Sequence, residues 1–356
     1  MTMRPFVLEG RSRASFLGAV AGASKLFAPV ADPAGGTVFA EVTSAAPAAP
    51  VVPTAPNTRL SVKSVFFPQR EVLLSYKASA IDAVPAVDGN LVVFGARPCD
   101  ARAMTWMDGV FGGGGREDPY FVERRRSAVV VAMACDDPCP TCFCTSVGGS
   151  PYGTDGVDVL ASPVGGGRVA ASGAGSAAPD LLLEQVSEKG AAFLVQHASC
   201  LRPATAAEAE ARASGARAAE ARMRNLDFSG VKEKMDAEFD APAWESIARS
   251  CLGCGACTYV CPTCHCFDIT DESRGERGVR IRTWDACQYA AFTVHASGHN
   301  PRPHKRARMR QRLMHKYSYA PETAGAVFCS GCGRCVRACP VNLDIREMLT
   351  ALEDLS

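Results

Sequence analysis

The sequence lacks any long hydrophobic run and any excess of charge of one sign. Its longest apolar stretches, residues 91–94 and 128–134, are far shorter than the roughly 18 residues that a membrane-spanning helix needs. The 38 basic and 37 acidic side chains give a net charge of +1, so the chain as a whole has no attraction for nucleic acid or an anionic membrane. We therefore expect a soluble protein in which electrostatic recognition is local.

Nucleotide-binding signatures are also missing. The four glycines at 112–115 are followed by Arg116 and lack the Gly-Lys-Ser/Thr ending of a P-loop. No Gly-x-Gly-x-x-Gly opens a helix after a strand. We expect a flexible loop at 112–115 and no nucleotide site in this chain.

The N-terminus superficially resembles a twin-arginine export signal. Arg11 and Arg13 precede an apolar run, but the two arginines are not adjacent and Lys25 interrupts the run early. We expect helix, strand, turn and strand here instead, with the last strand at residues 37–42. Reduced cysteines would be oxidised in the periplasm, so we predict a cytoplasmic protein.

The 356 residues suffice for about two domains. Up to residue 200, strand-like and helix-like segments alternate, and we predict strands at 62–67, 91–95, 127–133 and 192–196 and helices at 71–80 and 101–111. A long exposed helix at 203–226 then leads to a cysteine-rich part. We predict an α+β fold, with a mixed α/β domain at 1–240 and a second domain at 241–356.

The sequence contains 17 cysteines, an odd number in tight clusters, which favours metal ligation over disulfides. Two runs have the spacing Cys-x2-Cys-x2-Cys-x3-Cys-Pro, which binds 4Fe-4S clusters in two-cluster ferredoxins. Three thiolates on one tight loop can each meet a different iron, whereas the fourth iron must be reached from elsewhere. The runs are Cys251, Cys254, Cys257 and Cys261, and Cys329, Cys332, Cys335 and Cys339.

The fourth cysteine of each run ligates the other cluster in such ferredoxins. We therefore assign Cys251, Cys254, Cys257 and Cys339 to a first 4Fe-4S cluster, and Cys329, Cys332, Cys335 and Cys261 to a second. Structural zinc is the alternative, but it usually takes two separated Cys-x2-Cys pairs. We predict that residues 241–356 form a helical dicluster ferredoxin-like domain with a large insert between Cys261 and Cys329.

The insert carries a basic segment with few acidic residues and helical spacing. Its members are Arg302, His304, Lys305, Arg306, Arg308, Arg310, Arg312, His315 and Lys316. One interpretation is a structural helix whose arginines brace the anionic clusters and nearby carboxylates. The other is a docking face for an acidic partner subunit. Nucleic acid is not expected as a partner, because no aromatic residues interleave the charges.

Seven short motifs are spread along the chain. They are Phe66-Phe67-Pro68, Arg97-Pro98-Cys99-Asp100, Asp118-Pro119-Tyr120, residues 141–146, residues 261–267, Trp284-Asp285-Ala286-Cys287 and residues 298–303. With these motifs the chain resembles the family that contains the anaerobic sulfite reductase A subunit and the beta subunit of soluble sulfhydrogenases. The resemblance implies a non-catalytic electron-transfer subunit, which relays electrons between a flavin subunit that uses NAD(P)H and a catalytic hydrogenase or sulfite or sulfur reductase subunit.

The resemblance also places four cysteines of the N-terminal domain at motif positions, namely Cys99, Cys135, Cys142 and Cys144. Four thiolates are the number that a third iron-sulfur cluster needs, with Cys139 as a substitute ligand. The alternative is a group of buried or merely reduced thiols.

Cys264, Cys266 and Cys287 lie outside both runs, and we expect the first two near a cluster because they follow a ligand directly. An alternative function uses such extra cysteines for thiol-based reduction of sulfur species or disulfides.

Overall fold

The computed structural model describes residues 4–43, 57–78, 80–83, 89–164 and 178–353. The chain divides into two compact units, each assembled from separate segments. The first unit comprises Met1–Phe66, Asp88–Leu226 and Ser330–Cys332, and the second comprises Phe67–Val87, Asp227–Cys329 and Gly333–Ser356. Helices and strands are mixed throughout, which confirms the predicted α+β class.

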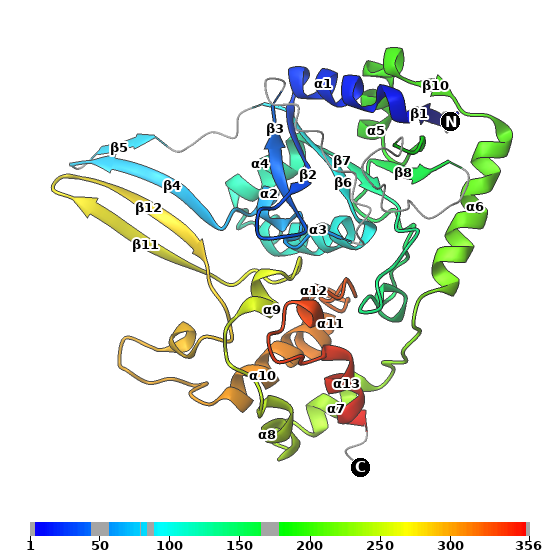
Figure 1. Cartoon of the computed structure of the whole chain (residues 1–356). Coiled ribbons are helices and arrows are strands. Elements are labelled where there is room, and N and C mark those ends of the chain that lie inside the picture. The colour runs from blue at the N-terminus through cyan, green and yellow to red at the C-terminus, as the bar shows by residue number, and fades with distance from the viewer. Residues whose placement is uncertain (1–3, 44–56, 79, 84–88, 165–177, 354–356) are drawn as a thin grey trace. The chain divides into compact units, whose positions relative to one another are not determined.

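The first unit is built on an eight-stranded sheet (Figure 1). In spatial order its strands are β10 (Arg202–Pro203), β1 (Phe6–Leu8), β9 (Leu181–Gln185), β8 (Val159–Pro163), β7 (Ala128–Met133), β6 (Leu91–Ala96), β2 (Lys25–Ala31) and β3 (Thr37–Val42). The central strands β2, β6, β7 and β8 are parallel, and the outer pairings are antiparallel. Parallel strands buried on both faces explain the continuous apolar runs in β6 and β7.

Two helices, α1 (Arg13–Ala23) and α5 (Glu188–Gln196), pack against one sheet face. Phe16 of α1 contacts Phe94 and Phe193, with ring centroids 6.3 and 6.1 Å apart. The same core includes Leu26, Val92, Val131, Met133, Val159, Ala161, Leu181 and Leu183. Further helices of this unit are α2 (Lys63–Phe66), α3 (Pro98–Phe111), α4 (Pro119–Ser127) and α6 (Ala206–Ala221).

The sheet also determines where two of the N-terminal cysteines lie. Cys99 follows β6 and opens α3, while Cys135 comes two residues after β7. Because β6 and β7 are parallel neighbours, their carboxyl ends meet at one edge of the sheet. Both thiols are therefore delivered to the same edge.

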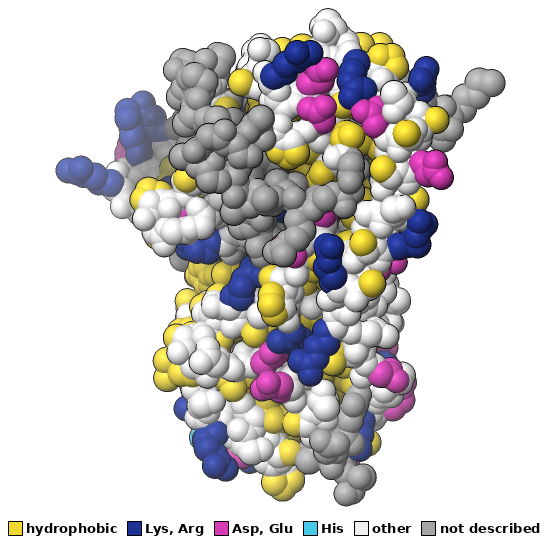
Figure 2. Space-filling view, turned by 45° about the vertical axis from the view of Figure 1, so that its right-hand side comes forward, with side chains coloured by type: hydrophobic (Ala, Val, Ile, Leu, Met, Phe, Trp, Pro, Cys, Tyr) yellow, Lys and Arg dark blue, Asp and Glu magenta, His cyan; other side chains and the backbone are white. Residues whose placement is uncertain are grey.

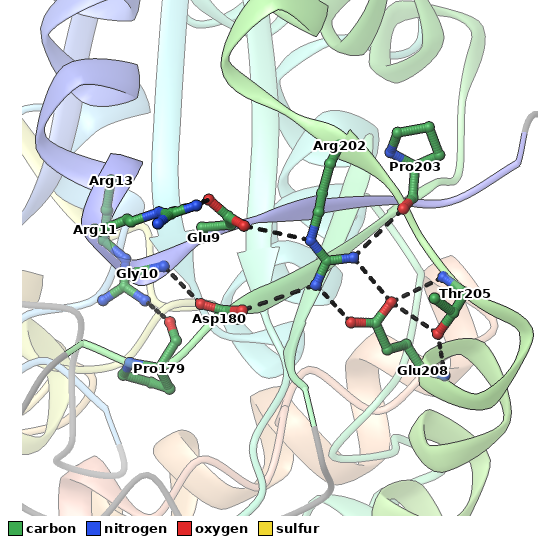
Figure 3. A network of polar contacts seen from close by, with 10 residues as sticks. All are labelled: Glu9, Gly10, Arg11, Arg13, Pro179, Asp180, Arg202, Pro203, Thr205 and Glu208. Carbon is green, nitrogen blue, oxygen red and sulfur yellow. Dashed lines mark hydrogen bonds and ion pairs between the residues drawn. The ribbon is translucent and has the colours of Figure 1, made fainter.

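A polar network joins β1, β10 and the start of α6 (Figure 3). Arg202 pairs with Glu208 at 2.6 Å and with Glu9 at 3.5 Å. Glu208 also accepts the backbone N–H of Thr205, and the Thr205 hydroxyl accepts the N–H of Glu208, so the pair forms a capping box. The Arg202 and Thr205 hydrogen bonds lower the pKa of Glu208 to about 2.

The second unit contains a four-stranded antiparallel sheet in the order β11 (Phe267–Arg274), β12 (Arg277–Trp284), β4 (Arg70–Lys77) and β5 (Ala80–Ala83). Arg282 and Glu71 form a buried ion pair across β12 and β4. The helices are α7 (Val231–Ala237), α8 (Ala243–Ala248), α9 (Ala256–Tyr259), α10 (Lys305–Met314), α11 (Ala320–Ala324), α12 (Arg334–Arg337) and α13 (Ile345–Glu353). A π-helical turn, His315–Tyr319, joins α10 to α11.

Three of the predicted elements are wrong. Residues 62–67 contain helix α2 rather than a strand, residues 71–80 contain strand β4 rather than a helix, and residues 192–196 belong to helix α5 rather than to a strand. Such short apolar segments do not distinguish helix from strand, and β4 is held by pairing with β12, about 200 residues away in the chain. The predicted strands at 37–42, 91–95 and 127–133 and the helices at 101–111 and 203–226 are confirmed in outline.

The molecular surface agrees with the balanced composition. On the face shown in Figure 2, Lys and Arg side chains are interspersed with Asp and Glu. Among the described residues, no helix combines the length and the apolar character that crossing a membrane requires.

Replacing Thr205 by alanine should weaken the start of α6, because it removes the side-chain acceptor of the capping box. We expect a loss of about 1 kcal/mol, seen as roughly fivefold faster hydrogen exchange of amides in the first turn of α6. The control is Ser214→Ala, an exposed site within the same helix. Unchanged exchange in T205A would contradict the capping role.

Candidate metal centres

The two cysteine runs adopt the same local backbone form. In the first run, Gly253 and Gly255 have φ of +69° and +73°, and α9 follows at once. In the second, Gly331 and Gly333 have φ of +64° and +68°, and α12 follows. Glycine adopts these left-handed angles without strain. The short helices α9 and α12 are in contact within the second unit (Figure 1).

Within the second unit, the four cysteines assigned to the first cluster line one cavity. They are Cys251, Cys254, Cys257 and Cys339, and Cys335 lies on the same wall. Much of the remaining wall is apolar, formed by Leu252, Met309, Val341, Leu343, Ile345 and Met348. The fold thus brings together thiols that are 88 residues apart in sequence, from Cys251 to Cys339. Backbone N–H groups point at two of the sulfurs, from Gly253 to Cys251 at 3.3 Å and from Leu343 to Cys339 at 3.2 Å.

The cysteines assigned to the second cluster are divided between the units. Cys261, Cys329 and Cys335 belong to the second unit and Cys332 to the first. Within the second unit, the Thr263 hydroxyl donates to the Phe328 carbonyl at 2.7 Å, which holds the segments that carry Cys261 and Cys329 side by side. Within the first unit, the Cys332 carbonyl accepts a hydrogen bond from Asn57 at 2.9 Å.

Two buried cations lie among the sulfurs of the second unit. The side chains of Arg312 and Lys316 belong to residues only 5% and 4% exposed. Arg312 Nη1 is 3.6 Å from Cys264 Sγ, and Arg312 Nη2 donates to the Cys257 carbonyl at 3.1 Å. Lys316 Nζ lies 3.3 Å from Cys261 Sγ and donates to the Thr263 hydroxyl and the Phe328 carbonyl, both at 2.9 Å.

The pKa shifts reflect this mixture of burial and charge. Burial alone would lower the pKa of Arg312 and of Lys316, but the neighbouring sulfurs reverse the direction and raise both. The pKa of Cys261 falls well below its usual value because the Cys264 thiol donates to it, and Lys316 and Arg312 add to this effect against the opposing influence of burial. The sulfurs are therefore partners for the positive charge.

These side chains fit an anionic group held by thiolates. Neither Arg312 nor Lys316 forms an ion pair with a carboxylate among the described residues. An uncompensated buried charge costs several kcal/mol, and the groups nearest to these cations that can carry negative charge are the cysteine sulfurs. In the same part of the chain, no three His, Cys, Asp or Glu side chains are arranged to hold a single metal ion. Thiols spread around a cavity suit a multi-iron cluster, because its iron and sulfide atoms together extend over several ångströms.

A separate group of thiols lies in the first unit. The four predicted residues, Cys99, Cys135, Cys142 and Cys144, line one cavity, and Cys332 is also on its wall. Cys139 Sγ is 2.9 Å from Cys142 Sγ. Burial raises the pKa of Cys135, and the cation of Arg97 partly offsets this.

The remaining thiols of the insert each hydrogen-bond to another thiol. Cys264 hydrogen-bonds to Cys261, and Cys266 hydrogen-bonds to Cys287. The Cys266 contact, the Arg312 charge and the Gln288 amide lower the pKa of Cys287 to about 5, although burial acts in the opposite direction. The structure places Cys264 directly against Cys261, a cysteine assigned to the second cluster.

The roles of Arg312 and Lys316 could not be read from the sequence. Both belong to the basic segment, but its spacing does not reveal which charges point inward. Arg306 on the same helix is exposed, whereas the π-helical turn after Met314 keeps Lys316 on the buried side. A spacing of four residues does not single out this pair, because Arg306 and Arg310 have the same spacing.

The chain is similar to a known protein over most of its length. A protein-family profile described as a 4Fe-4S dicluster domain matches residues 250–343. The sulfhydrogenase 2 subunit beta of Pyrococcus furiosus is 30% identical over 301 residues, which cover 84% of this chain and 84% of that protein. The chain belongs to the sulfhydrogenase beta-subunit family. Membership and the dicluster domain support an iron-sulfur, hydrogenase-related role in electron transfer, and the alignment extends well beyond the cysteine runs.

Replacing Gly331 by alanine should prevent the second cysteine loop from closing. A Cβ at this position would lie 2.5 Å from backbone atoms of Cys144, and φ is +64°. We expect anaerobically purified G331A to lose about four irons per chain. Gly275→Ala is the matched control, because φ is +61° there and nothing lies within 4 Å of the added carbon. A full iron content in G331A would contradict this packing.

Proposed function

We propose that this chain is the electron-relay subunit of a redox complex. It passes electrons between a flavin subunit that uses NAD(P)H and a catalytic subunit, either a hydrogenase or a sulfite or sulfur reductase. The observation that carries the proposal is the convergence of Cys251, Cys254, Cys257 and Cys339 on one apolar cavity. The sequence similarity to a sulfhydrogenase beta subunit supports the same role.

We assign the ligands as two interleaved sets. Cys251, Cys254, Cys257 and Cys339 hold the first 4Fe-4S cluster, and Cys329, Cys332, Cys335 and Cys261 hold the second. The motif spacing supports both sets. The shared cavity supports the first, and the Thr263 contact with Phe328 supports the second. The division at residue 240 and a cytoplasmic location remain predictions.

The chain's own residues hold and insulate the electron carriers. When bound, a 4Fe-4S cluster accepts and donates one electron at a time. The apolar wall formed by Met309, Leu343 and Met348 limits access of water to the first cavity. Peptide N–H groups that point at cysteine sulfurs stabilise negative charge there. Electron transfer of this kind needs no general acid or base.

The cysteines of the first unit are proposed to hold a third iron-sulfur cluster. Cys99, Cys135, Cys142 and Cys144 share a cavity, which supports this set. Cys139 is the candidate to replace one of these four ligands. Its sulfur contacts that of Cys142, so it lies beside the proposed ligand set.

A second candidate function for these thiols is disulfide chemistry. The 2.9 Å separation of the Cys139 and Cys142 sulfurs favours it, because two thiols this close can be oxidised to a disulfide. In this case Cys139 and Cys142 would exchange electrons as a dithiol, and the thiols of this cavity would hold no third cluster.

Iron and acid-labile sulfide counts distinguish these possibilities. We expect about twelve irons per anaerobically purified chain if the third cluster exists, and about eight if it does not. In the three-cluster case, Cys142→Ser should remove about four irons. Cys139→Ser and Cys144→Ser then test which of these two cysteines is a ligand of the third cluster. The variant that lacks a ligand should lose iron, whereas the other should keep it.

Cys200→Ser is the control for these counts, since Cys200 lies outside the candidate sites. About eight irons in both the parent protein and C142S would reject the third cluster. Disulfide chemistry of Cys139 and Cys142 would then be the remaining candidate function. Fewer than about four irons in the parent protein would reject the dicluster assignment as well.

The relay role predicts partners. An affinity-tagged chain, expressed from its native source under anaerobic conditions, should co-purify with a flavoprotein and a catalytic redox subunit. Addition of NADH or NADPH to the complex should then produce the EPR signals of reduced clusters. A chain that is isolated with its full iron content but always alone would contradict the relay and favour a sensor or a self-contained reductase.

A further inference from the structure

Helix α10 and the π-helical turn that continues it place two buried cations four residues apart. Arg312 lies in α10 and Lys316 in the π-helical turn that continues it. Both are almost fully buried, and neither forms an ion pair with a carboxylate among the described residues. All three N–H bonds of the Lys316 ammonium have an acceptor, so its position is fixed.

The two cations differ in their nearest contacts to the two cysteine sets. Arg312 lines the cavity of Cys251, Cys254, Cys257 and Cys339, and its Nη2 donates to the carbonyl of Cys257 at 3.1 Å. Lys316 Nζ instead lies 3.3 Å from the sulfur of Cys261, which we assign to the second set. Arg312 therefore borders the first set, although its Nη1 also reaches Cys264, which hydrogen-bonds to Cys261 of the second set. Lys316 lies beside the second set alone.

We infer that Arg312 and Lys316 are positioning residues that each raise the reduction potential of one cluster, Arg312 that of the first and Lys316 that of the second. The inference rests on the proposed ligand sets. Reduction adds negative charge to a site that already carries thiolate ligands. A fixed positive charge in a poorly screened interior stabilises the reduced form more than the oxidised form. Helix α10 and the π-helical turn after it thus place one cation near each proposed cluster.

The test is a potentiometric titration followed by EPR on Arg312→Gln and Lys316→Gln, with iron counted in every sample. Signals are assigned beforehand with Cys254→Ser for the first cluster and Cys332→Ser for the second. We expect R312Q to lower the potential mainly of the first cluster and K316Q mainly that of the second. Each change should be at least tenfold in the one-electron equilibrium constant, about 59 mV.

Two kinds of control accompany these variants. Arg306→Gln removes an exposed charge from the same helix and should leave both potentials unchanged. Arg312→Lys and Lys316→Arg keep the charge and should stay close to the parent potentials. If the glutamine variants lose iron while these charge-keeping variants retain it, the requirement for charge is supported.

Three results would overturn the inference. The first is a full iron content with unchanged potentials in both glutamine variants. The second is an equal shift of both clusters in each variant, which would reject the assignment of one cation to each cluster. The third is loss of iron in the charge-keeping variants as well. This result would indicate that iron binding depends on the packing of these side chains and not on their charge. The iron count of the parent protein tests the proposed function separately. If the parent protein holds about eight irons but the glutamine variants have unchanged potentials, the inference fails and the proposed function stands.

Discussion

Thiolates repel one another, so a chain that gathers many of them in a buried region must bring positive charge to the same place. The second unit does this with Arg312 and Lys316, which enter from one helix and its π-helical continuation. A buried guanidinium or ammonium without an anion would itself be destabilising, so the cations and the sulfurs each require the other. Lys316 also donates to the Thr263 hydroxyl, which itself joins the two cysteine segments, so the same cation contacts both the sulfurs and the link between their segments.

The two units gather thiols by different means. In the second unit, glycines with positive φ turn the chain sharply, so that three cysteines of a run lie on one short loop before a helix begins. In the first unit, the ends of the parallel strands β6 and β7 deliver Cys99 and Cys135 to one sheet edge, and Cys142 and Cys144 come from the loop beyond. Loop geometry is encoded within a dozen residues, whereas strand-end geometry depends on a sheet that spans the unit.

This difference explains how much the sequence could predict. The cysteine runs were recognisable because their ligand spacing is local, and the long apolar strands β6 and β7 were recognisable because burial on both faces leaves continuous apolar runs. The segments at 62–67, 71–80 and 192–196 were misassigned because short apolar stretches fit either periodicity. Strand β4 in particular is defined by its register with β12, an interaction that no local pattern contains. The inward direction of Arg312 and Lys316 likewise depends on tertiary packing.

The contacts of the basic segment bear on its two interpretations. Lys305 donates to the carbonyl of Cys251 at 3.0 Å, and Arg308 donates to the carbonyl of Pro303 at 2.8 Å. Arg310 pairs with Asp240 at 2.8 Å, while Arg312 and Lys316 face the sulfurs. Most of these charges are therefore satisfied inside the second unit, which favours bracing over docking.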